Sequence, residues 1–168
     1  MATVIVEGVS DRAALEALAR RRGRDLAAEG VGIAVLGGAH AVARYLARLP
    51  AEELDGRLLA LCDEREEPYF RQAGNGLEVF VCRPDLEAEL IRAAGPENVV
   101  GVIEALGEQR SFHSFQRQPF QRGRPLEAQL HRFLGTHSGR KALYARALVD
   151  AVAEESLPTP LEQLLLAI

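Results

Sequence analysis

The sequence predicts an α/β protein with a Rossmann-like arrangement of layers: a four-stranded, mainly parallel sheet with flanking helices, followed by a helical C-terminal extension. Through the first half of the chain, short apolar runs alternate with helical patterns, which is typical of parallel sheets with crossover helices. After about residue 95 the apolar residues recur only at helical spacing. The chain has 168 residues, 48% of them hydrophobic, which is enough to bury a core without disulfides or a structural metal.

The first predicted unit is a strand, a tight turn and a helix. Residues 3–6 are a short β-branched run, Gly8 lies in the turn, and a helix over residues 10–22 follows. Four apolar residues at helical spacing give this helix one buried stripe: Ala14, Leu15, Leu18 and Ala19. Residues 31–36 form a second strand, which should be parallel to the first because a helix connects them.

The other elements of the sheet follow in order: a helix over residues 41–49, strands over 57–62 and 77–82 with a Gly74-Asn75-Gly76 turn between them, and a helix from Pro84-Asp85 to about Ala94. The charged segment 63–68 belongs to the surface or to a site. Helices alone are then predicted, at roughly residues 96–106, 125–134, 139–153 and 159–167, whereas residues 111–124 show no clear period. We therefore expect an α/β core over residues 1–95 and a helical extension over 96–168, packed on the core as a single structural unit.

Acidic side chains follow three of the predicted strands. Glu7 comes directly after the first strand, Asp63 after the third, and Asp85 just beyond the fourth. The carboxyl ends of parallel strands share one edge of the sheet, where α/β proteins place their ligands. Carboxylates that converge there suit hard divalent cations such as Mg²⁺ or Mn²⁺. Simpler interpretations stay open: turn acids at Glu7 and Asp63, and an N-cap at Asp85 with Glu87 in the first turn of its helix.

Five motifs, in this order, resemble those of a known family: Glu7-Gly8-Val9-Ser10-Asp11, Gly37-Gly38, Leu61-Cys62-Asp63, Asp85-Leu86-Glu87 and Gly139-Arg140-Lys141. The chain resembles the TOPRIM domain of the OLD-family nucleases, most closely the short, free-standing forms that lack the family's ATPase. The resemblance covers nearly the whole chain. It implies a TOPRIM fold and a metal-dependent endonuclease that hydrolyses phosphodiester bonds, in DNA more than in RNA, with one or two Mg²⁺ or Mn²⁺ ions.

The resemblance also implies residue roles. A first cation would be held by Glu7 and Asp63 with help from Asp11, and a second by Asp85 and Glu87. Such ions activate a water and stabilise the leaving oxygen of an in-line displacement. Lys141 would act as a catalytic residue beside Glu7 and Asp63, by neutralising charge on the phosphoryl group.

One position departs from the family pattern. The family usually has a second Asp two residues after Asp63, and this chain has Arg65 there. Because an arginine does not ligate a cation, either Glu66 or Glu67 substitutes as a metal ligand, or the site binds one metal tightly instead of two.

The net charge of −4 hides an uneven distribution. Residues 1–109 carry 12 Lys or Arg against 19 Asp or Glu, whereas residues 110–146 carry 8 against one. The basic segment suits a phosphate backbone, although a solvated helical face explains it equally well. Its expected nucleic-acid contacts are Arg117, Arg122, Arg124, Arg140 and Lys141.

The cysteines, the histidines, the lengths of the apolar runs and the absent motifs exclude several classes of protein or make them less favoured. Cys62 and Cys82 each end a predicted strand, which favours buried thiols over a disulfide or a metal pair. The four histidines, His40, His113, His131 and His137, lack zinc-site spacing. No apolar run reaches transmembrane length and no leader precedes the first strand, so we expect a cytoplasmic protein without a membrane partner. Phosphate-loop, nucleophile-elbow and dinucleotide-turn motifs are absent, and the three tyrosines lie in helical patterns, which does not suggest a covalent tyrosine step.

Two alternatives to a nuclease remain from the sequence. Arg65 and the missing ATPase are compatible with a degenerate, non-catalytic TOPRIM module that binds nucleic acid or a partner protein, such as an ATPase supplied in trans. A phosphoacceptor receiver domain that uses Asp63 and Lys141 is less favoured, because such domains need paired acids after the first strand and Glu7 is followed by Gly8.

Overall fold

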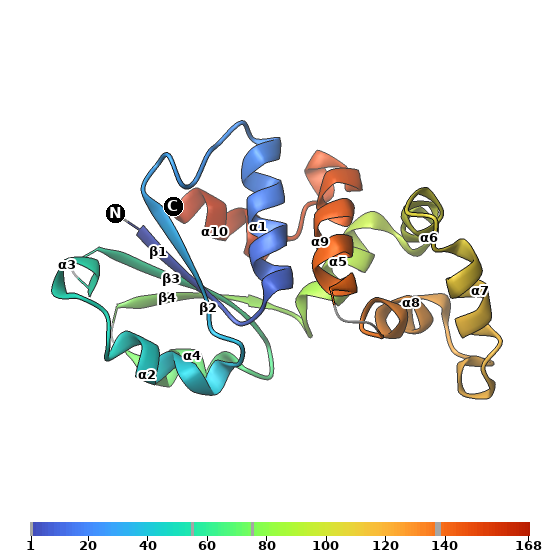
Figure 1. Ribbon diagram of the computed structural model, residues 1–168, viewed down its shortest axis with the longest axis horizontal. Coiled ribbons are helices and arrows are strands. Elements are labelled where there is room, and N and C mark those ends of the chain that lie inside the picture. Colours follow the sequence, from blue (N-terminus) through green and yellow to red (C-terminus); the bar gives the residue numbers. More distant parts are fainter. Residues whose placement is uncertain (1, 55, 75, 137–138) are drawn as a thin grey trace.

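The computed structural model describes residues 2–54, 56–74, 76–136 and 139–168. Asn75 of the predicted turn and His137 lie outside these ranges. Four parallel strands form one sheet in the order β2-β1-β3-β4 (Figure 1): β1 Ala2–Val6, β2 Val31–Val35, β3 Arg57–Asp63 and β4 Leu77–Cys82. The predicted four-stranded Rossmann-like sheet is therefore confirmed, and all of its pairings are parallel.

Side chains of the central strands alternate between two buried layers, as a pleated strand with both faces covered requires. Val4 and Val6 of β1 belong to the larger hydrophobic cluster, while Ile5 between them belongs to the smaller one. Leu59 and Ala60 of β3 alternate in the same way. The sheet is thus the middle layer of three.

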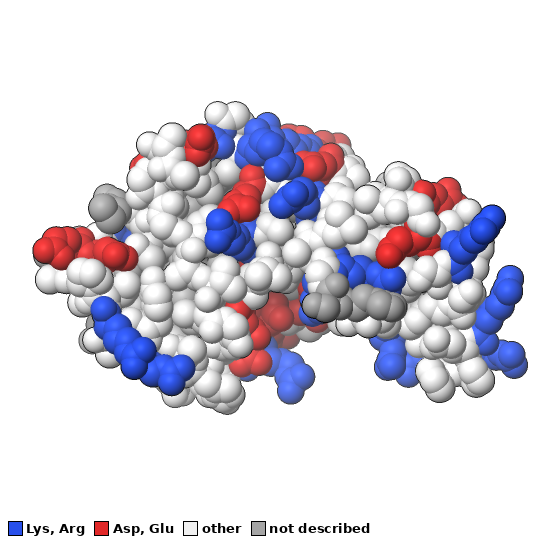
Figure 2. Space-filling model, viewed as in Figure 1, with Lys and Arg blue, Asp and Glu red and all other residues white. Residues whose placement is uncertain are grey.

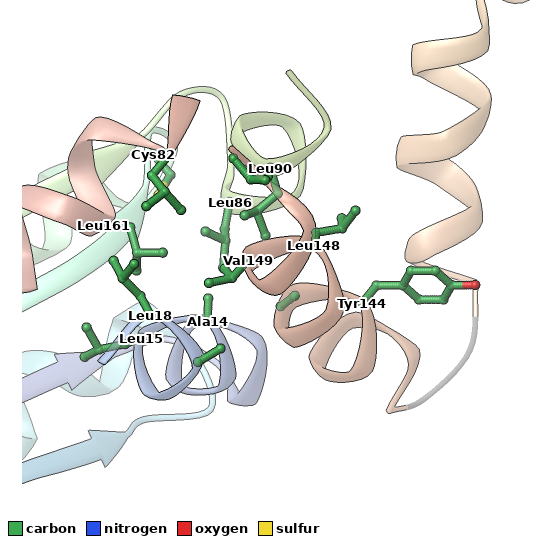
Figure 3. Packing of buried hydrophobic residues seen from close by; sticks show 14 of the residues in the cluster. Ala14, Leu15, Leu18, Cys82, Leu86, Leu90, Tyr144, Leu148, Val149 and Leu161 are labelled. Carbon is green, nitrogen blue, oxygen red and sulfur yellow. The ribbon is translucent and has the colours of Figure 1, made fainter. Parts of the chain in front are cut away.

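The larger cluster lies under helices from both halves of the chain: α1 Val9–Arg21, α5 Leu86–Ala94, α9 Arg140–Ala151 and α10 Thr159–Ala167. Leu15 and Leu18 of α1 lie close to Leu161 of α10, and Ala14 lies close to Val149 of α9 (Figure 3). The opposite face of the sheet is covered by η1 Ala39–Ala41, α2 Val42–Leu46 and α4 Glu67–Ala73. Two short pieces complete this part of the chain, α3 Ala51–Leu54 and η3 Glu154–Ser156.

Arginines at the end of α1 fasten it to the C-terminal helices. Arg21 Nη1 donates to the carbonyl oxygens of Val149 and Val152, each at 2.6 Å, and so caps the end of α9. Arg22 pairs with Glu162 of α10 at 2.7 Å. The C-terminal helices are therefore held to the sheet layer by polar contacts as well as by apolar burial.

Three helices project from the sheet as a helical arm, which we define as residues 96–134: α6 Pro96–Ala105, α7 Gln109–Gln116 and α8 Leu126–Leu134, with η2 Pro119–Gln121 between the last two (Figure 1). Phe112, Phe115 and Phe133 form the apolar centre of the arm, with ring centroids 5.0–6.5 Å apart. The carboxyl ends of the strands point toward this arm.

Buried polar contacts attach the arm to α9. Arg140 is only 8% exposed, and its guanidinium binds Glu108 Oε1 at 3.1 Å and lies over the ring of Phe133. Tyr144 donates its hydroxyl to Glu108 Oε2 at 2.8 Å. Because both oxygens of Glu108 are bound, the junction has a fixed geometry.

Within the described residues, three α-helices lie where the sequence predicted none: the four-residue α3, α4 and α7. Helix α4 occupies part of the charged segment 63–68 and beyond, because Phe70 supplies one fully buried anchor that periodicity over a short, charged stretch does not reveal. Helix α7 starts at Gln109 and runs into the segment 111–124, which showed no clear period because Phe112 and Phe115 are the only buried residues of the helix. The expected helix over 41–49 is a 3₁₀ turn followed by five residues of α-helix. Cys62 and Cys82 are buried free thiols, as predicted, and none of the described helices is long and apolar enough to cross a membrane.

Candidate metal centre

Glu7 and Asp63 meet at the carboxyl edge of the sheet because β1 and β3 are neighbours in register. Val6 pairs with Leu61, so Glu7 follows one strand as Asp63 ends the other. From β1 the chain turns to α1 on one face, and from β3 it turns to α4 on the other. A crevice at such a topological switch point is where open α/β sheets bind ligands.

A cavity of about 480 Å³ opens at this point. Four carboxylates and one amine line it: Glu7, Asp11, Asp63, Glu87 and Lys141. The rest of the lining includes small or polar residues of the β1–α1 turn and of the segment before α9, among them Gly8, Ser10, Gly135 and Gly139. In Figure 2 acidic side chains gather between the sheet and the helical arm, where these elements meet. These five residues were all predicted as catalytic or metal-binding residues, and the cavity brings them together. Asp85, which was also predicted as a metal ligand, lies beside the cavity.

Asp11 and Asp63 are held in place by backbone amides. Asp11 Oδ2 accepts from Gly8 N at 2.8 Å, and Asp63 Oδ1 accepts from Leu86 N at 3.1 Å. Burial raises the pKa of Asp11 to about 7, against the opposing effect of the Gly8 hydrogen bond. Burial also raises the pKa of Asp63 to about 7, with further repulsion from Asp85, Glu87 and Glu7. Burial disfavours the ionised form of both carboxylates, and a cation bound nearby would favour that form.

Glu7 offers an oxygen that nothing else uses. Its Oε2 is buried and has no hydrogen-bond partner in the described part of the chain. Burial raises the pKa of Glu7, and the charge of Glu66 adds to the effect. A buried, unpartnered carboxylate oxygen is costly unless a cation or a donor meets it. These oxygen donors fit a divalent ion such as Mg²⁺ or Mn²⁺.

Lys141 reaches the cavity from the start of α9. Its Nζ lies 3.3 Å from Glu87 Oε1, although Glu87 is 6% exposed and Lys141 is largely open to solvent. Burial lowers the pKa of Lys141, but the charges of Glu87, Asp63 and Asp85 outweigh it, so the net direction is upward. The amine therefore stays protonated beside the carboxylates.

Asp85 is the N-cap of α5, and its second carboxylate oxygen faces His131. Its Oδ1 accepts from Ala88 N at 2.8 Å at the start of α5, and its Oδ2 lies 2.7 Å from His131 Nε2. Asp85, Glu87 and His131 each offer a ligand atom, and these atoms all lie within 4.8 Å of one another. His131 was not among the predicted site residues. Its 46-residue separation from Asp85 leaves no local spacing that signals the pairing.

The structure separates the two glutamates that follow Arg65. Glu66 is close enough for its charge to raise the pKa of Glu7. The carboxylate of Glu67 instead binds Arg71 at 2.6 Å and Arg83 at 3.2 Å, and these contacts lower its pKa. Neither glutamate lines the cavity described above, but only Glu66 acts on Glu7 without being paired to an arginine in the described residues, so Glu66 is better placed to compensate for Arg65.

The predicted nucleic-acid contacts occupy different environments. Arg117 and Arg122 are exposed on the helical arm, and no acidic side chain pairs with either within the described ranges. Arg124 is exposed and donates to the carbonyl oxygen of Phe120 at 2.8 Å. Arg140 is buried against Glu108 and Phe133, so it serves the arm junction. Basic side chains protrude at the far end of the arm in Figure 2.

The parallel sheet, its switch point and the helices around it have the arrangement of a TOPRIM-type fold, and an acidic cavity lies at the carboxyl edge of the sheet. Residues 1–64 match the model of the family described as "Overcoming lysogenization defect protein-like, TOPRIM domain", so this part of the chain is similar to an OLD-like TOPRIM domain. The family resemblance seen in the sequence is thereby confirmed.

Solved structures extend the likeness in fold to the whole chain. The C-terminal region of the Burkholderia pseudomallei OLD protein has a TM-score of 0.65 at 18% identity, covering 99% of this chain and 95% of that one. The C-terminal region of the Xanthomonas campestris pv. campestris OLD protein, phased with platinum, has a TM-score of 0.63 at 22% identity, covering 99% and 91%. A search of curated proteins found no match. The helical arm and C-terminal helices therefore belong to a fold that these OLD regions share.

Proposed function

We propose that the protein is a divalent-metal-dependent phosphodiester hydrolase that acts on DNA, in preference to RNA. The observation that carries the proposal is the single cavity in which carboxylates of the β1–α1 turn, β3 and α5 meet a lysine of α9. A conserved fold alone does not define chemistry, whereas this set of side chains matches what phosphoryl transfer needs: ligands for hard cations and a positive charge beside them.

Each side chain has a distinct part in the proposed reaction. Glu7, Asp63 and Asp11 would hold one cation, and Asp85 with Glu87 a second. When bound, such cations supply an activated water and a charge that stabilises the leaving oxygen. The backbone amides of Gly8 and Leu86 fix the carboxylates, so the site needs little reorganisation.

Lys141 carries the charge that the phosphoryl group meets. Its ion pair with Glu87 orients the amine toward the cavity, and it is exposed enough to reach a bound phosphate. A fixed positive charge is most valuable where negative charge develops in the transition state. Lys141→Ala should therefore lower the cleavage rate more than the affinity for DNA.

The arm supports binding of a polyanion. Arg117 and Arg122 extend from it without acidic partners in the described part of the chain, and a duplex that lies across arm and cavity would meet both. The similar solved structures are C-terminal regions of OLD proteins, which fits a nucleic-acid-related role. An ATPase that acts in trans stays a prediction from the sequence resemblance.

The test is a nicking time course on supercoiled plasmid with Mg²⁺ or Mn²⁺. The parent protein should nick the plasmid only with metal, Glu7→Gln should be inactive, and Lys141→Ala should be slow. Asp150→Asn removes an exposed carboxylate far from the cavity and is the matched control, with parent activity expected. A parent protein that binds metal yet cuts neither plasmid nor single-stranded DNA contradicts the proposal and favours a non-catalytic module.

A further inference from the structure

We propose that the second cation position is a mixed nitrogen and oxygen site, formed by Asp85, Glu87 and His131, which takes a transition metal such as Mn²⁺ in preference to Mg²⁺. The inference rests on the proposed metal-dependent function and adds His131 as the residue that determines metal specificity. It arises from a juxtaposition that the sequence does not show, between the start of α5 and the middle of α8.

The distances fit a metal ion after a small adjustment. Two ligand atoms at about 2.1 Å from an octahedral ion and next to each other lie about 3.0 Å apart. Asp85 Oδ2 and His131 Nε2 are 2.7 Å apart, so they must separate by only a few tenths of an ångström to share an ion. The ligand atom of Glu87 lies within 4.8 Å of both, which is within reach of a third coordination position.

The three side chains are held in this arrangement by their own elements. Asp85 is fixed as the N-cap of α5 through Ala88 N, which leaves Oδ2 free to face the site. Glu87 is 6% exposed, and its buried Oε1 lies 3.3 Å from the Lys141 amine. A buried carboxylate needs positive charge beside it, which at Glu87 comes from the amine of an exposed lysine and which a bound metal ion would supply more strongly.

The nitrogen ligand sets the metal preference. Mg²⁺ is bound by oxygen ligands and retains water, whereas the affinity of a site that includes nitrogen rises along the first-row divalent metals from Mn²⁺ to Cu²⁺. The first position, with Glu7, Asp11 and Asp63, offers oxygen alone and has no such preference. The two positions should therefore differ in selectivity, although Glu87 borders both.

His131 also makes the arm part of the site. It belongs to α8, whereas Asp85 and Glu87 belong to the start of α5. An ion bound to all three would cross-link the arm, which carries Arg117 and Arg122, to the edge of the sheet. Metal at this position would thus fix the DNA-binding surface relative to the cavity.

The experiment is pulsed electron paramagnetic resonance of the Mn²⁺-loaded protein, in which a directly bound imidazole nitrogen modulates the electron spin echo. The parent should show this nitrogen signal. His131→Gln should abolish it, because the glutamine amide can still donate a hydrogen bond to Asp85 but does not ligate through nitrogen. His113→Ala, which removes an exposed histidine of α7, is the matched control and should keep the signal.

Calorimetric titration of the same proteins measures the preference. His131→Gln should lose on the order of tenfold or more in Mn²⁺ affinity at one site, by analogy with the cost of disturbing ligand shells, and should bind Mg²⁺ as the parent does. Thermal unfolding without metal should be unchanged, which shows that the structural contact survives.

Two outcomes overturn the inference, and they are distinguishable. Mn²⁺ that binds the parent without a nitrogen signal removes His131 from the site while leaving the proposed hydrolase intact. A parent that binds no Mn²⁺ at all overturns both the inference and the proposed function.

Discussion

Replacing Asp63 by Asn should stabilise the metal-free protein and remove its response to metal. The carboxylate sits among Asp85, Glu87 and Glu7, and burial raises its pKa from 3.8 to about 7. Asparagine has nearly the same shape, and its side-chain oxygen can still accept from Leu86 N. The substitution therefore removes a disfavoured charge and keeps the hydrogen bond.

The size and pH dependence of the effect follow from this pKa. Each tenfold change in proton affinity is about 1.4 kcal/mol, so a rise from 3.8 to about 7 corresponds to roughly 4 kcal/mol for a fully buried group. Asp63 is half-buried and water screens its charge, so we expect about 1–2 kcal/mol. Because the folded state binds the proton more tightly than the unfolded state, the parent loses this stability as the pH rises from about 4 to about 7. Asp63→Asn should equal the parent near pH 4 and exceed it at pH 8.

The assay is urea unfolding at pH 4.5 and pH 8, with chelator and with Mn²⁺. At 100 times its dissociation constant, Mn²⁺ should add about 2.7 kcal/mol to the parent and little to Asp63→Asn, so the order of stability reverses when metal is added. Asp150→Asn, an exposed change, should follow the parent within about 0.5 kcal/mol. An Asp63→Asn protein that is less stable than the parent at pH 8 without metal, or that still gains stability from Mn²⁺, refutes the reasoning.

Three further predictions concern other parts of the molecule. Glu66→Gln should weaken Mn²⁺ binding in a calorimetric titration because the charge of Glu66 acts on Glu7, whereas Glu67→Gln should not, because Glu67 is paired with arginines; equal effects would contradict the distinction. Replacing Arg117 and Arg122 by Glu should reduce the affinity for DNA and flatten its salt dependence, while metal binding stays unchanged. Fluorescence anisotropy at several salt concentrations measures the affinity and its salt slope. An unchanged salt slope would show that the arm is not part of the DNA interface. Tyr144→Phe leaves Glu108 Oε2 without its hydroxyl donor and should cost about 1–2 kcal/mol in urea unfolding, with no change in Mn²⁺ affinity; a stability equal to the parent's would show that this contact contributes nothing to the junction.

The sheet and its acidic edge could be predicted because each depends on local pattern. The strand ending at Val6 is mostly β-branched and apolar and is followed at once by Glu7, so the strand, its end and the carboxylate are all visible in seven residues. Parallel pairing then brings Asp63 to the same edge whatever the details of the connection. Asp85 was left between two interpretations, and the structure shows its capping bond together with a second, unpredicted contact.

What the sequence did not reveal depends on contacts between distant segments. His131 lies on a helix whose apolar residues explain its periodicity fully, and only the packing of α8 beside α5 brings the imidazole to Asp85. Arg140 looked like a surface cation in a basic segment, yet Glu108, 32 residues earlier, draws it into the arm junction. Glu66 and Glu67 are adjacent and chemically alike, and only the positions of Arg71 and Arg83 distinguish them.

Anomalous diffraction from crystals grown with Mn²⁺ tests most directly whether the cavity is a metal centre. We expect a strong anomalous peak within about 2.2 Å of carboxylate oxygens of Glu7 and Asp63, and a second one bounded by Asp85, Glu87 and His131. Well-occupied Mn²⁺ found only outside the cavity, with Glu7 and Asp63 unliganded, would contradict the account.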